Sequence, residues 1–332
     1  MPTLRGFRFR AVLALRFRAA LAIVCLVSAC GVEVPSAVTG AQEPGLRVIA
    51  PAAAGGGYDM TARSLARAWA AAGVAVDDVL VLPGSGGVVG LNRLVLERGN
   101  DRLLLVMGLG LVGALATTPS RHRVEDATPL ARLVTEPEAV LVPASSPLRT
   151  LPDLVDLWRE DPAALQFAGG SAEGGPDGLF RIQLARAVGV DPGASEYRSY
   201  DGGGDLLPAL LTGQVDVATT GISEYLDQIA SGTVRVLAVS GAQRVRGIDA
   251  PTVREQGVDL VFDNWRGILA PPGLSPDQID ALTDTIVRLV GSSVWQDMLA
   301  RNGWENALLT GDDFAQFLRE QADVVRSTLV SR

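Results

Sequence analysis

The sequence predicts an α/β fold with parallel-rich sheets flanked by helices. From Leu46 onward, short apolar runs of strand length alternate with segments whose apolar residues recur every three or four positions. Short connections between such segments favour parallel strands covered by helices. The chain has 332 residues and is 48% hydrophobic, which suffices for one or two domains with conventional cores.

The first 29 residues are predicted to be an export signal rather than part of the fold. Five arginines precede an apolar stretch, residues 19–29, that is too short to cross a bilayer. Residues 26–30 resemble a bacterial lipobox, in which the signal is cleaved before Cys30 and this cysteine carries the lipid. An ordinary signal peptide with an incidental cysteine is the alternative. We therefore expect an extracytoplasmic protein, in the periplasm or on the outer cell surface, anchored to the membrane through Cys30, with residues 30–45 as a tether.

Cysteine content and charge exclude several classes of protein. Cys25 lies in the predicted signal and Cys30 at its end, so the mature domain is expected to have neither a disulfide nor a cysteine nucleophile. The chain holds 29 basic and 37 acidic residues; the five arginines of the signal leave 24 basic against 37 acidic residues, a net charge of −13. Nucleic acid is therefore not an expected partner.

The individual elements follow from the same patterns. Strands are expected at residues 46–50, 79–82, 103–107, 139–142, 166–168, 215–219 and 234–239, and helices at 62–72, 151–158, 179–188, 206–211 and 225–230. From Ser275 the sequence predicts helices without strands. The first of them has Ser275 as its N-cap and Pro276 at its first helical position.

Glycine-rich turns after the strands are the most informative local feature. Residues 51–59 form a strand end, a turn with three glycines and a helix start, an arrangement whose free backbone N–H groups suit an anion. Close packing of the helix on its sheet is an equally good reading of this turn alone, and the turn matches neither the P-loop nor the dinucleotide fingerprint. Four further glycine turns follow predicted strands, at residues 83–90, 169–177, 201–204 and 221–225. Ligands bind beyond the carboxyl ends of strands in open α/β sheets, so we expect the turns to rim one cleft.

Five segments together resemble the substrate-binding protein of tripartite tricarboxylate transporters: residues 51–59, 83–90, 128–133, 167–171 and 265–273. The resemblance implies a two-lobed, periplasmic-binding-protein-like fold, similar to type II, with a ligand cleft between the lobes. It places residues 46–136 and 264–332 in lobe 1 and residues 137–263 in lobe 2. The two points at which the chain passes from one lobe to the other are expected to form a hinge.

The resemblance also implies a ligand site built largely from backbone N–H groups, hydroxyls and waters. Lobe 1 is expected to contribute Gly55, Gly56, Gly57, Tyr58 and Asp59, and lobe 2 to contribute Gly170, Ser171 and Asp177 with Gly203 and Gly221 nearby. Asp59 either fixes its turn, holds a water for the ligand, or is a plain first-turn acid. Gly178 stands where family members often have histidine, so ligand choice is expected to differ here. For Arg266 we favour a structural ion pair over a charged clamp on the ligand.

A binding protein is favoured over an enzyme. The one histidine, His122, lies in a polar connector, Ser171 is not in a G-x-S-x-G elbow, and the sequence shows no metal-binding or cofactor motif. The expected function is capture of a small di- or tricarboxylate, citrate-like by resemblance, by a monomeric receptor that serves the membrane permease subunits of such a transporter. A ligand sensor for a signalling system is the alternative, and a secreted hydrolase is the least favoured.

Overall fold

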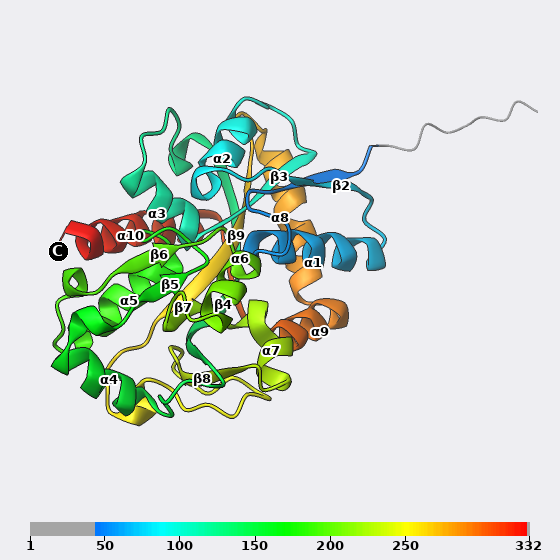
Figure 1. Ribbon diagram of the computed structural model, residues 1–332. Helices are drawn as coiled ribbons and strands as arrows, with labels where there is room; N and C mark the ends of the chain where they lie inside the picture. The colour runs from blue at the N-terminus through cyan, green and yellow to red at the C-terminus, as the bar shows by residue number, and fades with distance from the viewer. Residues whose placement is uncertain (1–43, 331–332) are drawn as a thin grey trace, which may run out of the picture. The chain divides into compact units, whose positions relative to one another are not determined.

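The computed structural model describes residues 44–330. The predicted signal, Cys30 and most of the tether therefore lie outside the described residues. Within them the chain forms a curled mixed sheet with helices on both sides of its strands (Figure 1). The strand order is β2-β1-β3-β9-β4-β7-β5-β6, with β8 and β10 also paired to β4. None of the helices between residues 44 and 330 is both long and apolar enough to cross a membrane.

The first three strands are parallel, as the alternating pattern predicts. Strand β1 lies between β2 and β3, and helices α1, α2 and α3 follow the three strands in turn. The elements are β1 (Leu46–Ala50), α1 (Gly57–Ala71), β2 (Val76–Val81), α2 (Val88–Val95), β3 (Leu103–Gly108) and α3 (Leu109–Thr117).

One long strand, β4 (Thr128–Pro143), connects the two halves of the sheet. Its first part pairs antiparallel with β9 (Asp263–Ala270) and β10 (Glu305–Thr310). Its second part pairs antiparallel with β7 (Val217–Gly221) and β8 (Val234–Val239). The expected parallel pairing therefore holds for the outer strands, whereas the centre of the sheet is antiparallel.

The second half of the sheet repeats the parallel arrangement. Strand β5 pairs in parallel with β6 and with β7, and helices alternate with these strands along the chain. The elements are α4 (Leu151–Glu160), β5 (Phe167–Gly169), α5 (Pro176–Ala187), β6 (Tyr197–Ser199), α6 (Gly203–Leu211) and α7 (Leu226–Ala230).

The C-terminal part contains α8 (Pro276–Val290), α9 (Ser293–Asn302) and α10 (Gly311–Val330). The predicted cap is confirmed: the hydroxyl oxygen of Ser275 accepts a hydrogen bond from the Gln278 amide, and Pro276 is the first helical residue. The expectation of helices without strands is wrong, because β10 lies between α9 and α10. Its residues Glu305, Ala307 and Leu308 suit a helix, and pairing with β4 overrides that local preference.

Most other predicted elements are found, with shifted ends. The run predicted at residues 139–142 is only the second half of β4, and β6 and β9 are not among the predicted strands. Strand β9 is buried along nearly all of its length.

The core lies on both sides of the sheet. Trp69 and Trp295 are buried in the cluster under α1, α8 and α9, and Trp158 and Phe180 are buried in the cluster under α4 and α5.

Candidate functional site

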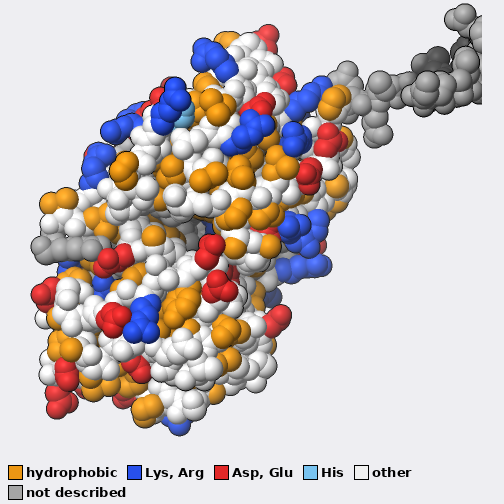
Figure 2. All heavy atoms as spheres, turned by 45° about the horizontal axis from the view of Figure 1, so that its top comes forward, with side chains coloured by type: hydrophobic (Ala, Val, Ile, Leu, Met, Phe, Trp, Pro, Cys, Tyr) orange, Lys and Arg blue, Asp and Glu red, His pale blue; other side chains and the backbone are white. Residues whose placement is uncertain are grey.

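All five glycine-rich turns line a single cavity of about 420 Å³. The turn after β1 contributes Gly56, Gly57 and Tyr58, and the turn after β2 contributes residues 84–86. The turns after β5, β6 and β7 supply the opposite wall, and β9 adds Asn264 and Arg266. Figure 2 shows a hollow across the middle of this face with acidic side chains beside it. Such a cavity has the size of a small-molecule site.

On one wall, the N-terminus of α1 faces the cavity with uncapped amides. The N-cap residue is Gly56, which offers no side chain, so the first-turn N–H groups of Gly57 and Tyr58 have no partner inside the helix. The guanidinium of Arg266 lies against the same turn, because a methyl group placed on Gly57 would overlap its Nη2. A helix N-terminus and a guanidinium side by side form a place for an anion.

Arg266 is also half of a buried ion pair, as the sequence favoured. Its Nη1 donates to Oε2 of Glu136, and the two side chains are 4% and 0% exposed. Oε1 of Glu136 accepts from the amide of Ser223 at 2.8 Å and from its hydroxyl at 2.6 Å. Burial opposes the charge on Arg266, but Glu136 outweighs it and the pKa of Arg266 is raised. The guanidinium is therefore a permanent charge held in place by β4 and the segment after β7.

Tyr58 connects the turn after β1 to helix α3. Its hydroxyl oxygen accepts a hydrogen bond from the amide of Leu111 at 2.9 Å, and burial raises the pKa of Tyr58 to about 12. Gly110 allows this approach, because a side chain there would meet the tyrosine hydroxyl at 2.9 Å. Tyr58 therefore caps α3 and borders the cavity at once.

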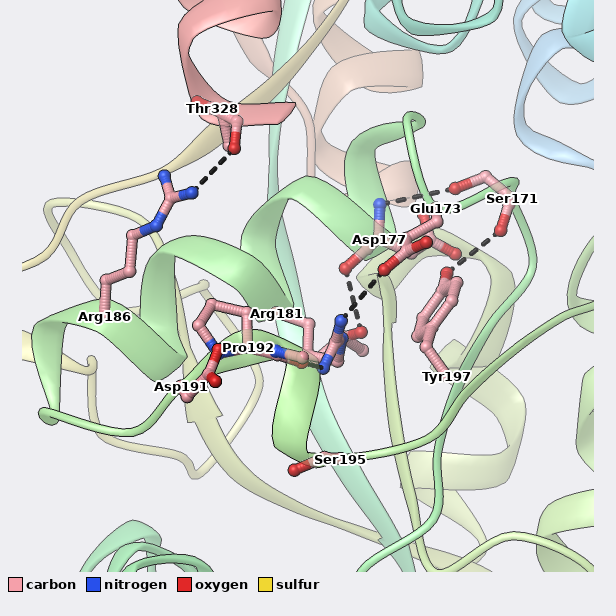
Figure 3. Close-up of polar contacts among 12 residues, drawn as sticks. Ser171, Glu173, Asp177, Arg181, Arg186, Asp191, Pro192, Ser195, Tyr197 and Thr328 are labelled. Atoms are coloured by element: carbon pink, nitrogen blue, oxygen red, sulfur yellow. Dashed lines mark hydrogen bonds and ion pairs between the residues drawn. The ribbon is translucent and has the colours of Figure 1, made fainter. Parts of the chain in front are cut away.

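The opposite wall is the turn after β5, which is held in place by α5. The hydroxyl oxygen of Ser171 accepts from the Asp177 amide at 3.3 Å. Tyr197 donates its hydroxyl hydrogen to the Ser171 carbonyl at 2.9 Å, and Arg181 pairs with Glu173 at 3.2 Å (Figure 3). Figure 3 shows these contacts around the turn that carries Ser171 and Glu173, so α5 and β6 hold the turn in place.

Acidic side chains lie on this wall. Burial raises the pKa of Asp177 to about 6, although its polar neighbours Ser171 and Gly170 act to lower it. Oε2 of Glu224 accepts from the amide of Gly203, the first residue of α6, at 2.7 Å. Burial raises the pKa of Glu224 to about 7.

A further acid, Glu138, lies two residues beyond Glu136 on the same face of β4. It is fully buried, and neither of its carboxyl oxygens has a hydrogen-bond partner among the described residues. Burial raises the pKa of Glu138 well above its ordinary value, and the charges of Asp177 and Glu136 add to this. These surroundings therefore favour the neutral form of Glu138.

Of the predicted site residues, the cavity wall includes seven: Gly56, Gly57, Tyr58, Gly170, Ser171, Asp177 and Gly221. The other three support the turns from behind. Gly55 donates its amide hydrogen to Oδ2 of Asp59 at 2.8 Å, so Asp59, which also pairs with Arg63, fixes its turn. Gly203 donates to Glu224 as described above.

Sequence reasoning missed the acidic side chains Glu136, Glu138 and Glu224. A signal for two of them was present, since Glu136 and Glu138 interrupt an apolar run at alternate positions and must share one face of a strand. No group of histidine, cysteine or acidic side chains within residues 44–330 is arranged to hold a metal ion.

Comparisons with known proteins agree with this arrangement. The family model for the tripartite tricarboxylate transporter family receptor, TctC, matches residues 73–330. BugT of Bordetella pertussis is 27% identical over 323 residues, covering 91% of this chain and 94% of that protein. MatC from Rhodopseudomonas palustris, solved with bound malate, has a TM-score of 0.73 at 23% identity, covering 86% of this chain and 99% of that one. An R. palustris protein solved with adipate has a TM-score of 0.77 at 22% identity, covering 86% and 97%.

The curled mixed sheet, with a cavity lined by its turns, has the fold of periplasmic binding proteins. The chain belongs to the tripartite tricarboxylate transporter receptor family. The predicted resemblance, the fold class and the choice of a binding protein over an enzyme are thereby confirmed.

Proposed function

We propose that this protein is an extracytoplasmic lipoprotein receptor that captures a small di- or tricarboxylate for the permease subunits of a tripartite tricarboxylate transporter. The observation that carries the proposal is the α1 N-terminus, with its uncapped amides, beside the Arg266 guanidinium in the shared cavity. These groups suit a carboxylate without a basic surface. The malate and adipate bound to two structural neighbours support the choice of ligand class.

The proposed ligand contacts are the predicted residues that line the cavity, with Arg266 added. The amides of Gly57 and Tyr58 and the guanidinium of Arg266 would hold one carboxylate. Ser171 and Asp177, on the opposite wall, would contact the other end of the ligand. Gly55, Asp59 and Gly203 shape the turns that position these groups.

We further propose that the protein closes on its ligand as two lobes, residues 46–136 with 264–332 and residues 137–263. The pairing of β4 with β9 supports this division, because Glu136 lies opposite Asn264 and Pro137 opposite Asp263, so both crossings are adjacent. Small-angle scattering is expected to show a smaller radius of gyration with ligand than without. An unchanged radius together with saturable binding would contradict closure.

The experiment that tests the ligand class is a thermal-shift screen of the mature chain from Val32 onward against mono-, di- and tricarboxylates, amino acids and nucleotides. A ligand at 100 times its Kd adds about 2.7 kcal/mol to the free energy of unfolding and raises the melting temperature. We expect shifts only with di- or tricarboxylates. Shifts with nucleotides alone, or none with any carboxylate, would overturn the proposal.

A further inference from the structure

The two walls of the cavity differ in the groups that they offer. The α1 wall presents helix amides and the Arg266 guanidinium. The opposite wall presents the carboxyl groups of Asp177, Asp201 and Glu224. A ligand with a carboxylate at each end therefore finds donors at one end and acceptors at the other.

The clearest donor for a second carboxylate on this wall is already used, because the amide at the start of α6 donates to Glu224 at 2.7 Å. Asp177 lies on the same wall as Ser171, whose hydroxyl oxygen accepts from the Asp177 amide. The guanidinium of Arg266 belongs to the α1 wall and not to this one. A plain second carboxylate on this wall must displace a protein carboxylate or lie beside it, and like charges at contact distance oppose that.

Glu224 is the acid of this wall that is both anchored and accessible. Asp177 is only 5% exposed, whereas Glu224 is half-buried and borders the cavity. Gly203 permits its position, because a side chain there would meet Oε2 of Glu224 at 2.7 Å. The helix N-terminus fixes the carboxyl group in a defined place as a hydrogen-bond acceptor.

We propose that Glu224 selects ligands that carry a hydrogen-bond donor, a hydroxyl or an ammonium group, close to a carboxylate, in preference to plain dicarboxylates. The carboxylate of such a ligand lies at the α1 turn and Arg266, and its donor points to Glu224. The proposal rests on the proposed function and narrows its ligand class.

Matched ligands that differ in one group test this. Calorimetric titrations of the mature chain at pH 8, above the pKa of about 7 for Glu224, compare succinate with malate and aspartate, glutarate with 2-hydroxyglutarate and glutamate, and tricarballylate with citrate. We expect at least one donor-bearing ligand to bind about tenfold or more tightly than its plain analogue, the ratio that a hydrogen bond to a charged group gives. The hydroxyl and ammonium members of the succinate and glutarate sets show which donor is preferred.

Two variants attribute the preference to its residue. Glu224→Gln keeps an oxygen for the Gly203 amide but removes the charge, and the preference is expected to fall below about threefold. Asp205→Asn is the matched control, because Asp205 is an exposed acid on the first turn of α6, the helix whose first amide binds Glu224. The preference for donor-bearing ligands is expected to persist in this variant. If Glu224→Gln does not fold, the wild-type ratios alone decide.

The outcomes separate this inference from the proposed function. Equal binding of plain and donor-bearing ligands by the wild type, or a preference that survives Glu224→Gln, would overturn the role of Glu224 and leave the carboxylate receptor standing. Absence of binding by every carboxylate would overturn both.

Discussion

The ion pair of Arg266 and Glu136 is the most deeply buried charge pair at the candidate site. Removing one partner of such a pair leaves an uncompensated charge in the interior. Arg266→Met is therefore expected to lower the free energy of unfolding by about 3–5 kcal/mol, measured by urea denaturation without ligand. The double variant Glu136→Gln with Arg266→Met is expected to recover much of that loss.

An exposed pair provides the control for this prediction. Arg254 and Asp259 are 57% and 92% exposed, and Arg254→Met is expected to change the free energy of unfolding by less than about 1 kcal/mol. If Glu136→Gln with Arg266→Met lowers the free energy of unfolding by as much as the two single variants added together, Arg266 and Glu136 do not stabilise each other.

Glu138 gives the stability a predictable dependence on pH. Its pKa in the folded protein is raised well above 4.5 by burial, so the folded state binds its proton more tightly than the unfolded chain does. The free energy of unfolding therefore falls as the pH rises from about 4.5 towards the folded pKa, and stays lowered above it. Glu138→Gln removes this loss and is expected to raise the melting temperature by about 2 °C or more near pH 8, with no gain below about pH 4.

Thermal melts across that pH range measure the effect. Glu320→Gln, on the exposed side of α10, is the control and is expected to follow the wild type. A gain from Glu138→Gln that is equally large at pH 4 would mean that packing rather than protonation causes it.

At the scale of elements, helix α3 touches the turn before α5 through glycine backbone. Gly113 of α3 lies directly on Gly174, and a methyl group on Gly113 would overlap the Gly174 carbonyl oxygen. The two residues belong to different predicted lobes. Gly113→Ala is expected to separate α3 from the turn that carries Ser171 and to weaken ligand binding about tenfold or more, because positioning is lost.

The stability without ligand is expected to change little, since alanine favours the helix by up to about 1 kcal/mol. Under the proposed closure of two lobes, this contact can also open without unfolding either lobe. Gly204→Ala is the matched control, because no atom lies within 4 Å of a methyl group there. Titration calorimetry measures the ligand affinity of both variants, and thermal melts measure their stability without ligand. A large loss of stability with unchanged affinity would make Gly113 a packing residue only.

The accuracy of sequence-based prediction also differs between elements. The N-cap at Ser275 and the glycine turns are local features, encoded by residues adjacent in the chain, and the structure contains them. Strands β9 and β10 are not local, because each is stabilised by pairing with β4 at a distance of more than 120 residues. Composition indicates a helix for β10, and only its partner strand makes it extended.

At the scale of the whole molecule, the proposed lipid anchor has a direct test. The basic segment, the apolar stretch and the residues before Cys30 predict lipidation of this cysteine. Cys30→Ala in the full chain is expected to move the protein from the membrane fraction to the soluble extracytoplasmic fraction, measured by fractionation and immunoblotting. Cys25→Ala is the control and is expected to stay in the membrane fraction. Retention of the Cys30→Ala variant on membranes would contradict the anchor.

The sequence by itself determined the α/β class, the series of glycine turns and the likeness to a receptor family. Turn residues and the spacing of hydrophobic residues depend only on residues close together in the chain. Seven of the ten site residues that the sequence predicted lie on the cavity wall. Only the tertiary structure decided what faces them. Glu136, Glu138 and Glu224 come from β4 and the segment after β7, and Glu136 pairs with Arg266 of β9 because β4 and β9 lie side by side in the sheet. Burial raises the pKa values of Glu138 and Glu224, and burial is a property of the folded chain and not of any short segment of it.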